Sequence, residues 1–326
     1  MAHLIETMAY AGDTPWHNLG QQLPRKQPLE VWAQKAGMDW TICQTPVHYI
    51  SERTGGIQAL KAFEEQKVLY RSDTKAALSV VSSRYRVVQP QEVLEFYRDL
   101  TEASGYEMET AGVLKAGRKF WALARTGQHS ALKGSDTVDG YLLLATSCDG
   151  SLATTVMPTT VRVVCHDTLT MAIDGASGNA IRVPHSTTFD AEAIKRQLGI
   201  AVSHWDSFMC RMKTLSERKV KTKEALEYFG QVLNSKSVSA EPRSEAAIVP
   251  HERAAKRLQA LYEGQGRGAE LAAAKGTAWG LLNAVTEYVD HERRARSQEY
   301  RLDSAWFGQG AALKQRALDL ALELTS

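Results

Sequence analysis

The chain has 326 residues, 44% of them hydrophobic, which predicts a globular protein with a substantial core. Lys and Arg number 39 against 37 Asp and Glu, so a basic surface must come from local clustering of charge. No apolar run reaches the roughly 20 residues that span a bilayer, and the four cysteines form no C-x-x-C pair. We therefore expect a cytoplasmic protein without membrane contact, structural zinc or a disulfide framework.

Residues 1–56 are expected to form an N-terminal arm that packs on the core or on a neighbouring subunit. The segment holds Trp16, Trp32 and Trp40 among several prolines, which favour extended connections. Within it, residues 29–37 have the pattern of a short helix that ends at a glycine. Trp16 has no evident chemical role, and a large aromatic residue of this kind is typical of an assembly interface.

Residues 57–189 are expected to form the core, because the hydrophobic period changes there to that of strands. Residues 77–81 have the pattern of a buried strand, and a helix is predicted from Pro90 to just before Gly105. The other predicted elements are a hairpin of residues 106–114 and 118–126, strands at 140–147 and 153–164, a short helix at 169–173 and a strand near 181–183. Together they predict an α+β fold with an antiparallel strand meander and packed helices.

Residues 190–326 are expected to form an all-helical C-terminal subdomain. Apolar residues recur at helical spacing from Asp190 towards Val220. Further helices are predicted at 223–233, 251–262, 268–288 and 311–324. Residues 234–250 are rich in Ser, Glu, Lys and Pro, which is typical of an exposed linker.

Basic residues gather at predicted turns and strand ends, close to aromatic residues. Phosphate binding needs convergent Arg and Lys, and base stacking needs aromatic faces such as those of Tyr106 and Trp121. The candidate nucleic-acid-binding residues are Arg84, Tyr85, Arg86, Lys115, Arg118, Lys119 and Arg162. Arg162 interrupts an apolar strand, so it must pair or bind something when one face of that strand is buried. Solvated charge at hairpin tips is the alternative explanation for the others.

Two segments carry residue types that occur in catalytic or metal sites. Cys165-His166-Asp167 places a nucleophile, a base and a carboxylate in succession, but neighbours in sequence rarely converge on one reacting atom. Asp290-His291 offers metal-ligand types without H-E-x-x-H or a comparable spacing. We therefore assign no catalytic residue, metal or cofactor. A metal- or cysteine-dependent enzyme acting on nucleic acid is the alternative.

Four segments, TPWHNLG at 14–20, SRYRVVQP at 83–90, TVRVVCHDTL at 160–169 and GTAWGLLNAVTEYVDH at 276–291, resemble one known family. It is a family of phage- and plasmid-related proteins known as a domain of unknown function carried on mobile elements. The resemblance spans nearly the whole chain. It implies a mobile-element setting, in which handling DNA is the commonest task.

The last of these segments mixes polar residues into an apolar helical pattern. Its glycines permit close approach of another backbone, and Asn283 has the chemistry to bond across to the N-terminal arm. Mixed polar helix faces often meet partners. We therefore expect Trp279 and Asn283 to form a homo-oligomer interface together with Trp16.

These patterns favour a protein that binds single-stranded DNA and is not an enzyme. No helix-turn-helix or zinc-finger spacing points to duplex DNA, and no nucleotide-hydrolysis or nuclease motif is present in the sequence. At fold level, a strand meander with basic hairpin tips is broadly similar to phage single-strand annealing proteins, which pair strands without ATP. Interference with host machinery through protein contacts is a further alternative.

Overall fold

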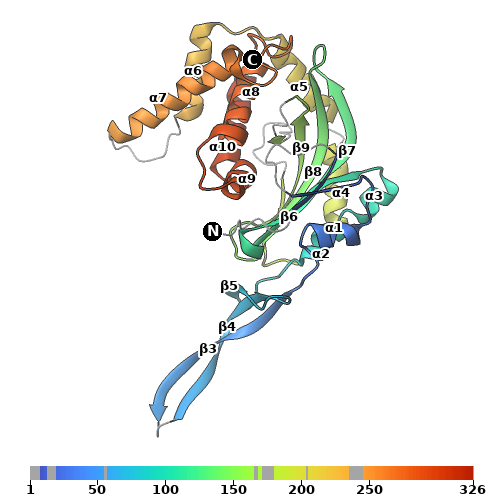
Figure 1. The fold of residues 1–326 in the computed structure, drawn as a ribbon, viewed down its shortest axis with the longest axis vertical. Helices are drawn as coiled ribbons and strands as arrows, with labels where there is room; N and C mark the ends of the chain where they lie inside the picture. Colours follow the sequence, from blue (N-terminus) through green and yellow to red (C-terminus); the bar gives the residue numbers. More distant parts are fainter. Residues whose placement is uncertain are drawn as a thin grey trace. The chain divides into compact units, whose positions relative to one another are not determined.

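The computed structural model describes residues 8–12, 20–54, 57–164, 168–170, 180–202, 205–234 and 245–325. The chain divides into two compact units. Unit 1 comprises Met1–Gly127, Leu142–Met157 and Ala180–Gly199, and unit 2 comprises Gln128–Tyr141, Pro158–Asn179 and Ile200–Ser326. Helices and strands both contribute extensively, which confirms the α+β class (Figure 1).

The large sheet contains the predicted meander. Its strand order is β10-β9-β8-β7-β6-β1-β2, and β11 pairs with β9 beside this path. The strands are β1 (Met8–Ala11), β2 (Gln21–Leu23), β6 (Glu107–Leu114), β7 (Lys119–Ala131), β8 (Thr137–Ser147), β9 (Thr154–Arg162), β10 (Thr168–Thr170) and β11 (Ile181–Val183). β6 pairs antiparallel with β7, as expected for the predicted hairpin, and β9 pairs antiparallel with β10. At the other edge β1 pairs with β2 in parallel, so the sheet is mixed.

Strand β10 replaces part of a predicted helix. Residues 168–170 pair antiparallel with residues 159–161 of β9, so the helix expected at 169–173 is wrong for residues 169 and 170. Residues 171–173 lie outside the described part of the chain. A helix of one turn carries the full entropic cost of nucleation, whereas β9 offers a ready edge for ladder hydrogen bonds.

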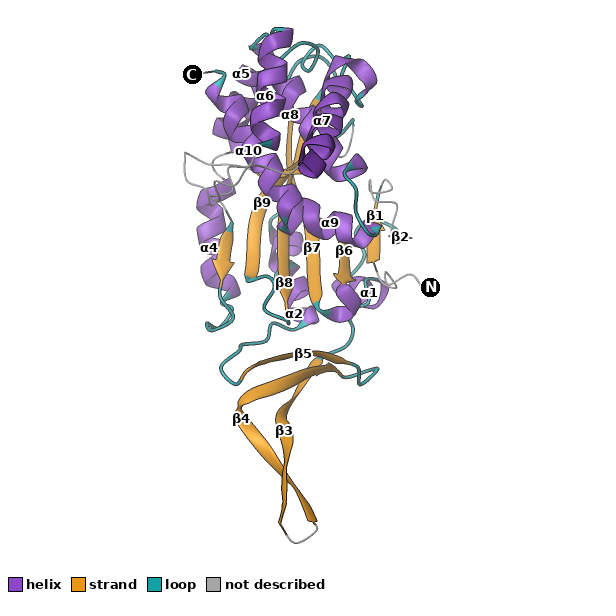
Figure 2. Cartoon of the chain, turned by 90° about the vertical axis from the view of Figure 1, so that its left-hand side faces the viewer, coloured by secondary structure: helices purple, strands orange, loops and turns teal. Residues whose placement is uncertain are grey.

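A second sheet, in unit 1, consists of β3 (Ile42–Thr54), β4 (Ile57–Arg71) and β5 (Ala77–Ser82) in that order (Figure 2). β3 and β4 form a long antiparallel hairpin that extends beyond its pairing with β5. The boundary expected at 56/57 therefore falls directly before β4 and separates two strands that pair with each other. Ile50 and Leu60 are cross-strand partners, and their side chains are 61% and 66% exposed. Because this hairpin does not bury all of its apolar residues on one face, its sequence lacks the alternation of apolar and polar residues that indicates a strand.

The core of unit 1 lies between the large sheet and short helices. These are α1 (Leu29–Lys35), α2 (Pro90–Glu95), α3 (Arg98–Ala103) and the first part of α4 (Ala191–Val202). The single helix expected after Pro90 is interrupted between α2 and α3, where both Phe96 and Tyr97 are fully buried. Successive residues of a continuous helix point about 100° apart, so the interruption allows both rings to reach the core. The Tyr97 hydroxyl lies 2.8 Å from the carbonyl oxygen of Ala122.

Unit 2 is predominantly helical. Its helices are α5 (Trp205–Glu217), α6 (Thr222–Leu233), α7 (Glu245–Ala260), α8 (Ala278–Glu287), α9 (Gln298–Phe307) and α10 (Gln309–Glu323), with π-helical turns at Leu261–Gln265 and Tyr288–Glu292. The linker expected at 234–250 is helical from Glu245 on, and residues 235–244 lie outside the described part of the chain. The helix expected at 268–288 begins only at Ala278, because turns occupy residues 267–276.

Across the described residues, no helix has the combination of length and apolarity that crossing a lipid bilayer requires.

The tip of the β6–β7 hairpin depends on Gly117. Its φ is +97°, and a Cβ atom there would lie 3.2 Å from atoms of Arg71, Leu78 and Trp40. Gly105 also has a positive φ, +71°, but a Cβ there would meet open space. We expect Gly105→Ala to lower the free energy of unfolding by about 1 kcal/mol through backbone strain, and Gly117→Ala by about 2–3 kcal/mol because crowding is added.

Urea denaturation of both variants measures the difference. Equal losses at the two positions would contradict the contribution of crowding at Gly117.

Candidate functional site

The turn between β8 and β9 brings two predicted basic segments of unit 1 together. The Tyr85 hydroxyl donates a hydrogen bond to the carbonyl oxygen of Ser147 at 2.9 Å. The next residue, Cys148, donates its amide to the carbonyl oxygen of Arg118 at 2.8 Å. The segment 84–86 after β5 and the tip of the β6–β7 hairpin therefore both contact this turn, although about 30 residues separate them in sequence.

We call Lys67, Arg84, Arg86, Lys115 and Arg118 the basic cluster. Arg84, Arg86 and Arg118 are exposed, and within the described residues none of these three forms an ion pair with a carboxylate.

The charges of the cluster act on one another. Burial lowers the pKa of Lys67, and the nearby Arg86 guanidinium lowers it further. The Lys67 ammonium donates a hydrogen bond to the carbonyl oxygen of Tyr85 at 2.9 Å, which places it beside the segment 84–86. Burial by itself would raise the pKa of Asp149, but hydrogen bonds from Ser151 and Ser147 and the charge of Lys115 keep it below its usual value. Asp149 thus stays ionised and partly offsets the positive charge at the turn.

Tyr85 positions the cluster. Its ring stacks on the imidazole of His185 with centroids 4.4 Å apart. The ring nitrogens of His185 lie 3.1 Å from the carbonyl oxygen of Arg86 and 3.0 Å from that of Leu152. The sequence does not single out His185, because an isolated histidine after a short strand carries no recognisable motif. One face of Tyr85 is therefore covered, and its main role is to hold the segment 84–86 in place.

Three other candidates are buried. Lys119 and Arg162 are each 3% exposed and Trp121 is fully buried, so none of them is accessible to a nucleic acid in this structure. Lys119 and Trp121 lie in β7 beyond the hairpin tip, where the strand belongs to the core. The structure removes Lys119 and Arg162 from the predicted binding surface and Trp121 from the predicted stacking residues.

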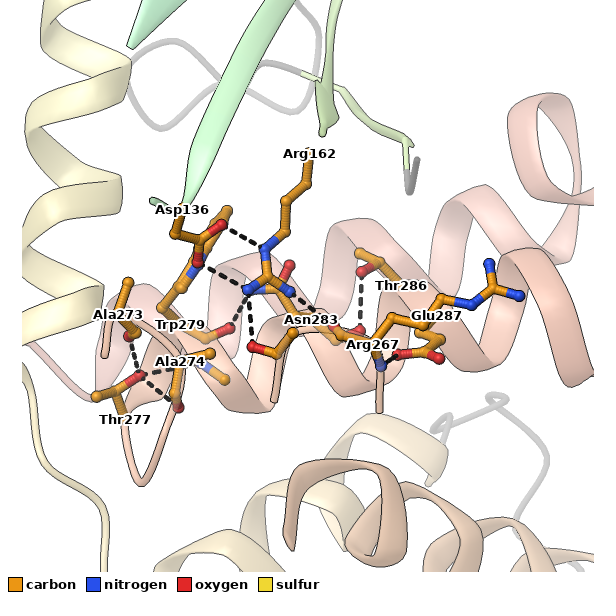
Figure 3. Close-up of polar contacts among 12 residues, drawn as sticks. Asp136, Arg162, Arg267, Ala273, Ala274, Thr277, Trp279, Asn283, Thr286 and Glu287 are labelled. Carbon is orange, nitrogen blue, oxygen red and sulfur yellow. Dashed lines mark hydrogen bonds and ion pairs between the residues drawn. The ribbon is translucent and has the colours of Figure 1, made fainter. Parts of the chain in front are cut away.

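Arg162 instead belongs to a buried polar cluster in unit 2 (Figure 3). Its guanidinium donates two hydrogen bonds to the carboxylate of Asp136, from Nε to Oδ1 and from Nη2 to Oδ2, each at 2.7 Å. Asp136 is fully buried, and the indole Nε1 of Trp279 donates to its Oδ2 at 3.0 Å. The expectation that Arg162 must pair is confirmed, and its partner is Asp136.

The same guanidinium also bonds to the turns that precede helix α8. Arg162 Nη2 donates to the carbonyl oxygen of Gly268 at 3.1 Å, and Nη1 donates to that of Arg267 at 3.3 Å. The amide of Arg267 donates in turn to the Glu287 carboxylate at 2.8 Å. These contacts hold the turns that precede α8. Thr277 then caps the helix, because its hydroxyl oxygen accepts a hydrogen bond from the amide of Gly280 at 3.1 Å.

Trp279 and Asn283 have roles within the chain. Trp279 is 3% exposed and Asn283 is 7% exposed, and the Asn283 side-chain amide donates to the carbonyl oxygen of Trp279 at 2.6 Å. Side chains buried in one chain cannot anchor a second copy, so the predicted interface is corrected for these two residues. Trp16 lies outside the described residues. The close backbone approach expected for the glycines of this segment is present at Gly280, whose neighbour is the carbonyl of Ala274, but not at Gly276, where a Cβ atom would meet open space.

The residues considered for chemistry do not form a site in the described part of the chain. Asp290 is fully buried and accepts a hydrogen bond from the Lys314 ammonium at 2.8 Å. His291 lies beside the Arg267 guanidinium at 3.3 Å. No group of three or more His, Cys, Asp or Glu residues suited to a metal ion occurs among the described residues. Cys165-His166-Asp167 lies outside them.

Removing one partner of the Asp136–Arg162 pair should destabilise unit 2. We expect Asp136→Asn to lower the free energy of unfolding by about 3–5 kcal/mol, because it leaves a buried guanidinium without a counter-charge. Asp319→Asn, on the exposed side of α10, should change it by less than about 0.5 kcal/mol. Chemical denaturation measures both. A loss below about 1 kcal/mol for Asp136→Asn would contradict the structural importance of this pair.

The Cys148 thiol should be unreactive in the folded protein. Burial raises its pKa to about 12, and the Asp149 carboxylate raises it as well. The thiol therefore stays protonated and shielded at pH 8, whereas the Cys210 side chain is exposed. Iodoacetamide labelling at pH 8, followed by peptide mass spectrometry, should modify Cys210 first and Cys148 only after denaturation. Equal labelling rates under native conditions would refute this.

Comparison with known proteins identifies a family but no function. A search of curated proteins and a search of solved structures each found no match. The family described as "Domain of unknown function (DUF932)" matches residues 77–306, which include most of the basic cluster and the whole Asp136–Arg162–Trp279 contact. The chain therefore belongs to this family.

Proposed function

We propose that the chain binds single-stranded nucleic acid at the basic cluster, and that its ligand is DNA. The observation that carries the proposal is the convergence of segment 84–86 and the β6–β7 tip on the turn at residues 147–150. Because Tyr85 and the backbone of Arg118 make these two contacts, the exposed Arg84, Arg86 and Arg118 are all held within one residue of a contact to the turn. Arginines without carboxylate partners are suited to phosphate oxygens, because the guanidinium donates hydrogen bonds in a planar fork.

The surroundings of the cluster favour binding over catalysis. The thiol at the turn, Cys148, is protonated and buried, and Asp149 is held by hydrogen bonds to neighbouring serines. No nucleophile paired with a base is evident at this surface among the described residues. Binding of phosphates requires only accessible cations, and the release of counterions supplies much of the affinity.

A finer proposal concerns assembly. Phage single-strand annealing proteins act as oligomers, and we propose that this chain also handles DNA as a homo-oligomer in a mobile-element setting. The support is the fold-level likeness of the strand meander and the resemblance in sequence. The exposed apolar residues of the β3–β4 hairpin, such as Ile50 and Leu60, offer a surface for self-association.

The binding proposal predicts that the affinity for a single strand depends on salt and on the charges of Arg84, Arg86 and Arg118. Fluorescence anisotropy with a labelled single-stranded oligonucleotide should give an affinity that falls steeply between 50 and 200 mM salt, on the order expected for several phosphate contacts. The triple variant Arg84→Gln/Arg86→Gln/Arg118→Gln should bind more weakly. The slope of log affinity against log salt should fall by roughly 2, since each phosphate contact to a single strand contributes about 0.7.

The matched control removes three exposed arginines elsewhere, Arg196, Arg253 and Arg294, each replaced by Gln. It makes the same change in net charge and should retain most of the affinity. Equal weakening of both triple variants would refute the site, and binding that is indifferent to salt would refute the function. Light scattering with and without the oligonucleotide tests assembly, because a particle that remains monomeric in both conditions contradicts the oligomer.

A further inference from the structure

Unit 2 contains a cavity of about 400 Å³ that is separate from the buried polar cluster. It lies along one face of α10, from Gln309 through Leu313 to Arg316. The lining is completed by Leu233 at the end of α6, by Tyr288 at the start of a π-helical turn and by Arg293 directly after that turn. The cavity is therefore bounded by two guanidinium groups, a phenol, an amide and aliphatic side chains.

The two arginines have only neutral partners. Arg293 donates to the side-chain oxygen of Gln309 at 3.0 Å and to the hydroxyl of Ser304 at 3.4 Å. Arg316 donates to the carbonyl oxygen of Val232 at 3.3 Å. Both side chains are half-buried, and among the described residues no carboxylate lines the cavity or forms an ion pair with either guanidinium. Two positive charges in one recess without a counter-charge attract an anion.

Other features of the lining suit a phosphate ester. Burial raises the pKa of Tyr288, although the nearby Arg293 opposes this, so the hydroxyl stays protonated and available as a donor. The nearby Glu292 carboxylate is occupied by Arg257, which donates to it twice at 2.5 Å. The volume exceeds what a lone phosphate fills and lies within the range of about 300–1,000 Å³ that is usual for small-molecule sites. A phosphate monoester carries close to two negative charges at neutral pH, which matches two guanidinium groups.

We propose that this cavity binds a small phosphate monoester of mononucleotide size. Arg293 and Arg316 neutralise the phosphate, while Tyr288, Leu233 and Leu313 contact the organic part. The site differs from the basic cluster in residues and in unit, so it does not depend on the proposed binding of single strands.

Isothermal titration calorimetry on the full chain tests the site with adenosine 5′-monophosphate as the probe. The nucleotide should bind at low salt, adenosine should not, and inorganic phosphate should bind more weakly than the nucleotide. Arg293→Gln and Arg316→Gln should each weaken binding by about tenfold or more, because each removes charge-assisted hydrogen bonds. Arg294→Gln is the matched control, since Arg294 is exposed and does not line the cavity.

Arg316 also supports the end of α6, so thermal melting of each variant must accompany the titration. Ala312→Glu is a second test that keeps both arginines and places a carboxylate in the cavity, and it should abolish nucleotide binding. A single-stranded oligonucleotide without a terminal phosphate should bind the Arg316→Gln variant with unchanged affinity, which separates this site from the basic cluster. No binding of the nucleotide at millimolar concentration by the folded wild type, or equal weakening by Arg294→Gln, would overturn the proposal.

Discussion

A buried guanidinium is stable only when a nearby carboxylate balances its charge and acceptor atoms satisfy its N–H groups. This constraint organises unit 2. Asp136 supplies the counter-charge for Arg162 and also accepts the indole hydrogen of Trp279. The donors of Arg162 that reach the carbonyls of Arg267 and Gly268 hold the turns before α8. One side chain of strand β9 thus links the end of that strand, residue 136 just before β8, and the start of a helix more than 100 residues later. Loss of Asp136 would leave the Arg162 guanidinium buried without a counter-charge, and it would weaken the contacts that join these elements.

Burial gives three sets of basic residues different chemistry. Arg162 and Lys314 are buried, and each forms an ion pair with a buried carboxylate. The nitrogen–oxygen distances are 2.7 Å to Asp136 and 2.8 Å to Asp290, so these two charges are neutralised inside the protein. Arg84, Arg86 and Arg118 are exposed and have no such partner among the described residues, so their charge remains available to a ligand. Arg293 and Arg316 are intermediate, because they are half-buried and bond to neutral oxygens. A chain with a net charge near zero can therefore still carry two positively charged surfaces, because within the described residues no carboxylate forms an ion pair with their arginines.

The basic cluster relies on a short turn for its geometry. Segment 84–86 has no regular secondary structure, and it is held by contacts of Tyr85 with Ser147, His185 and Lys67. Because the turn between β8 and β9 receives both Tyr85 and the hairpin tip, a change there would move several arginines at once. This arrangement suits the flexible backbone of a single strand, which needs several cations at the right spacing and no deep pocket.

The sequence by itself determined the class of fold and many of its elements, because these depend on local periodicity and turn residues. The hairpin around Lys115–Gly117, strand β11 and helix α6 all follow from patterns within a few residues. It also determined that Arg162 needed a partner, because a charge buried in an apolar strand is strongly destabilising unless it is paired. Only the tertiary structure decided that the partner is Asp136 and that Trp279 completes the contact, because a pairing across 143 residues leaves no local periodicity. Tertiary packing likewise decided which basic residues reach the surface: Lys119 and Arg118 are adjacent in sequence, yet one lies in the core and the other in solvent, because the strand enters the sheet between them.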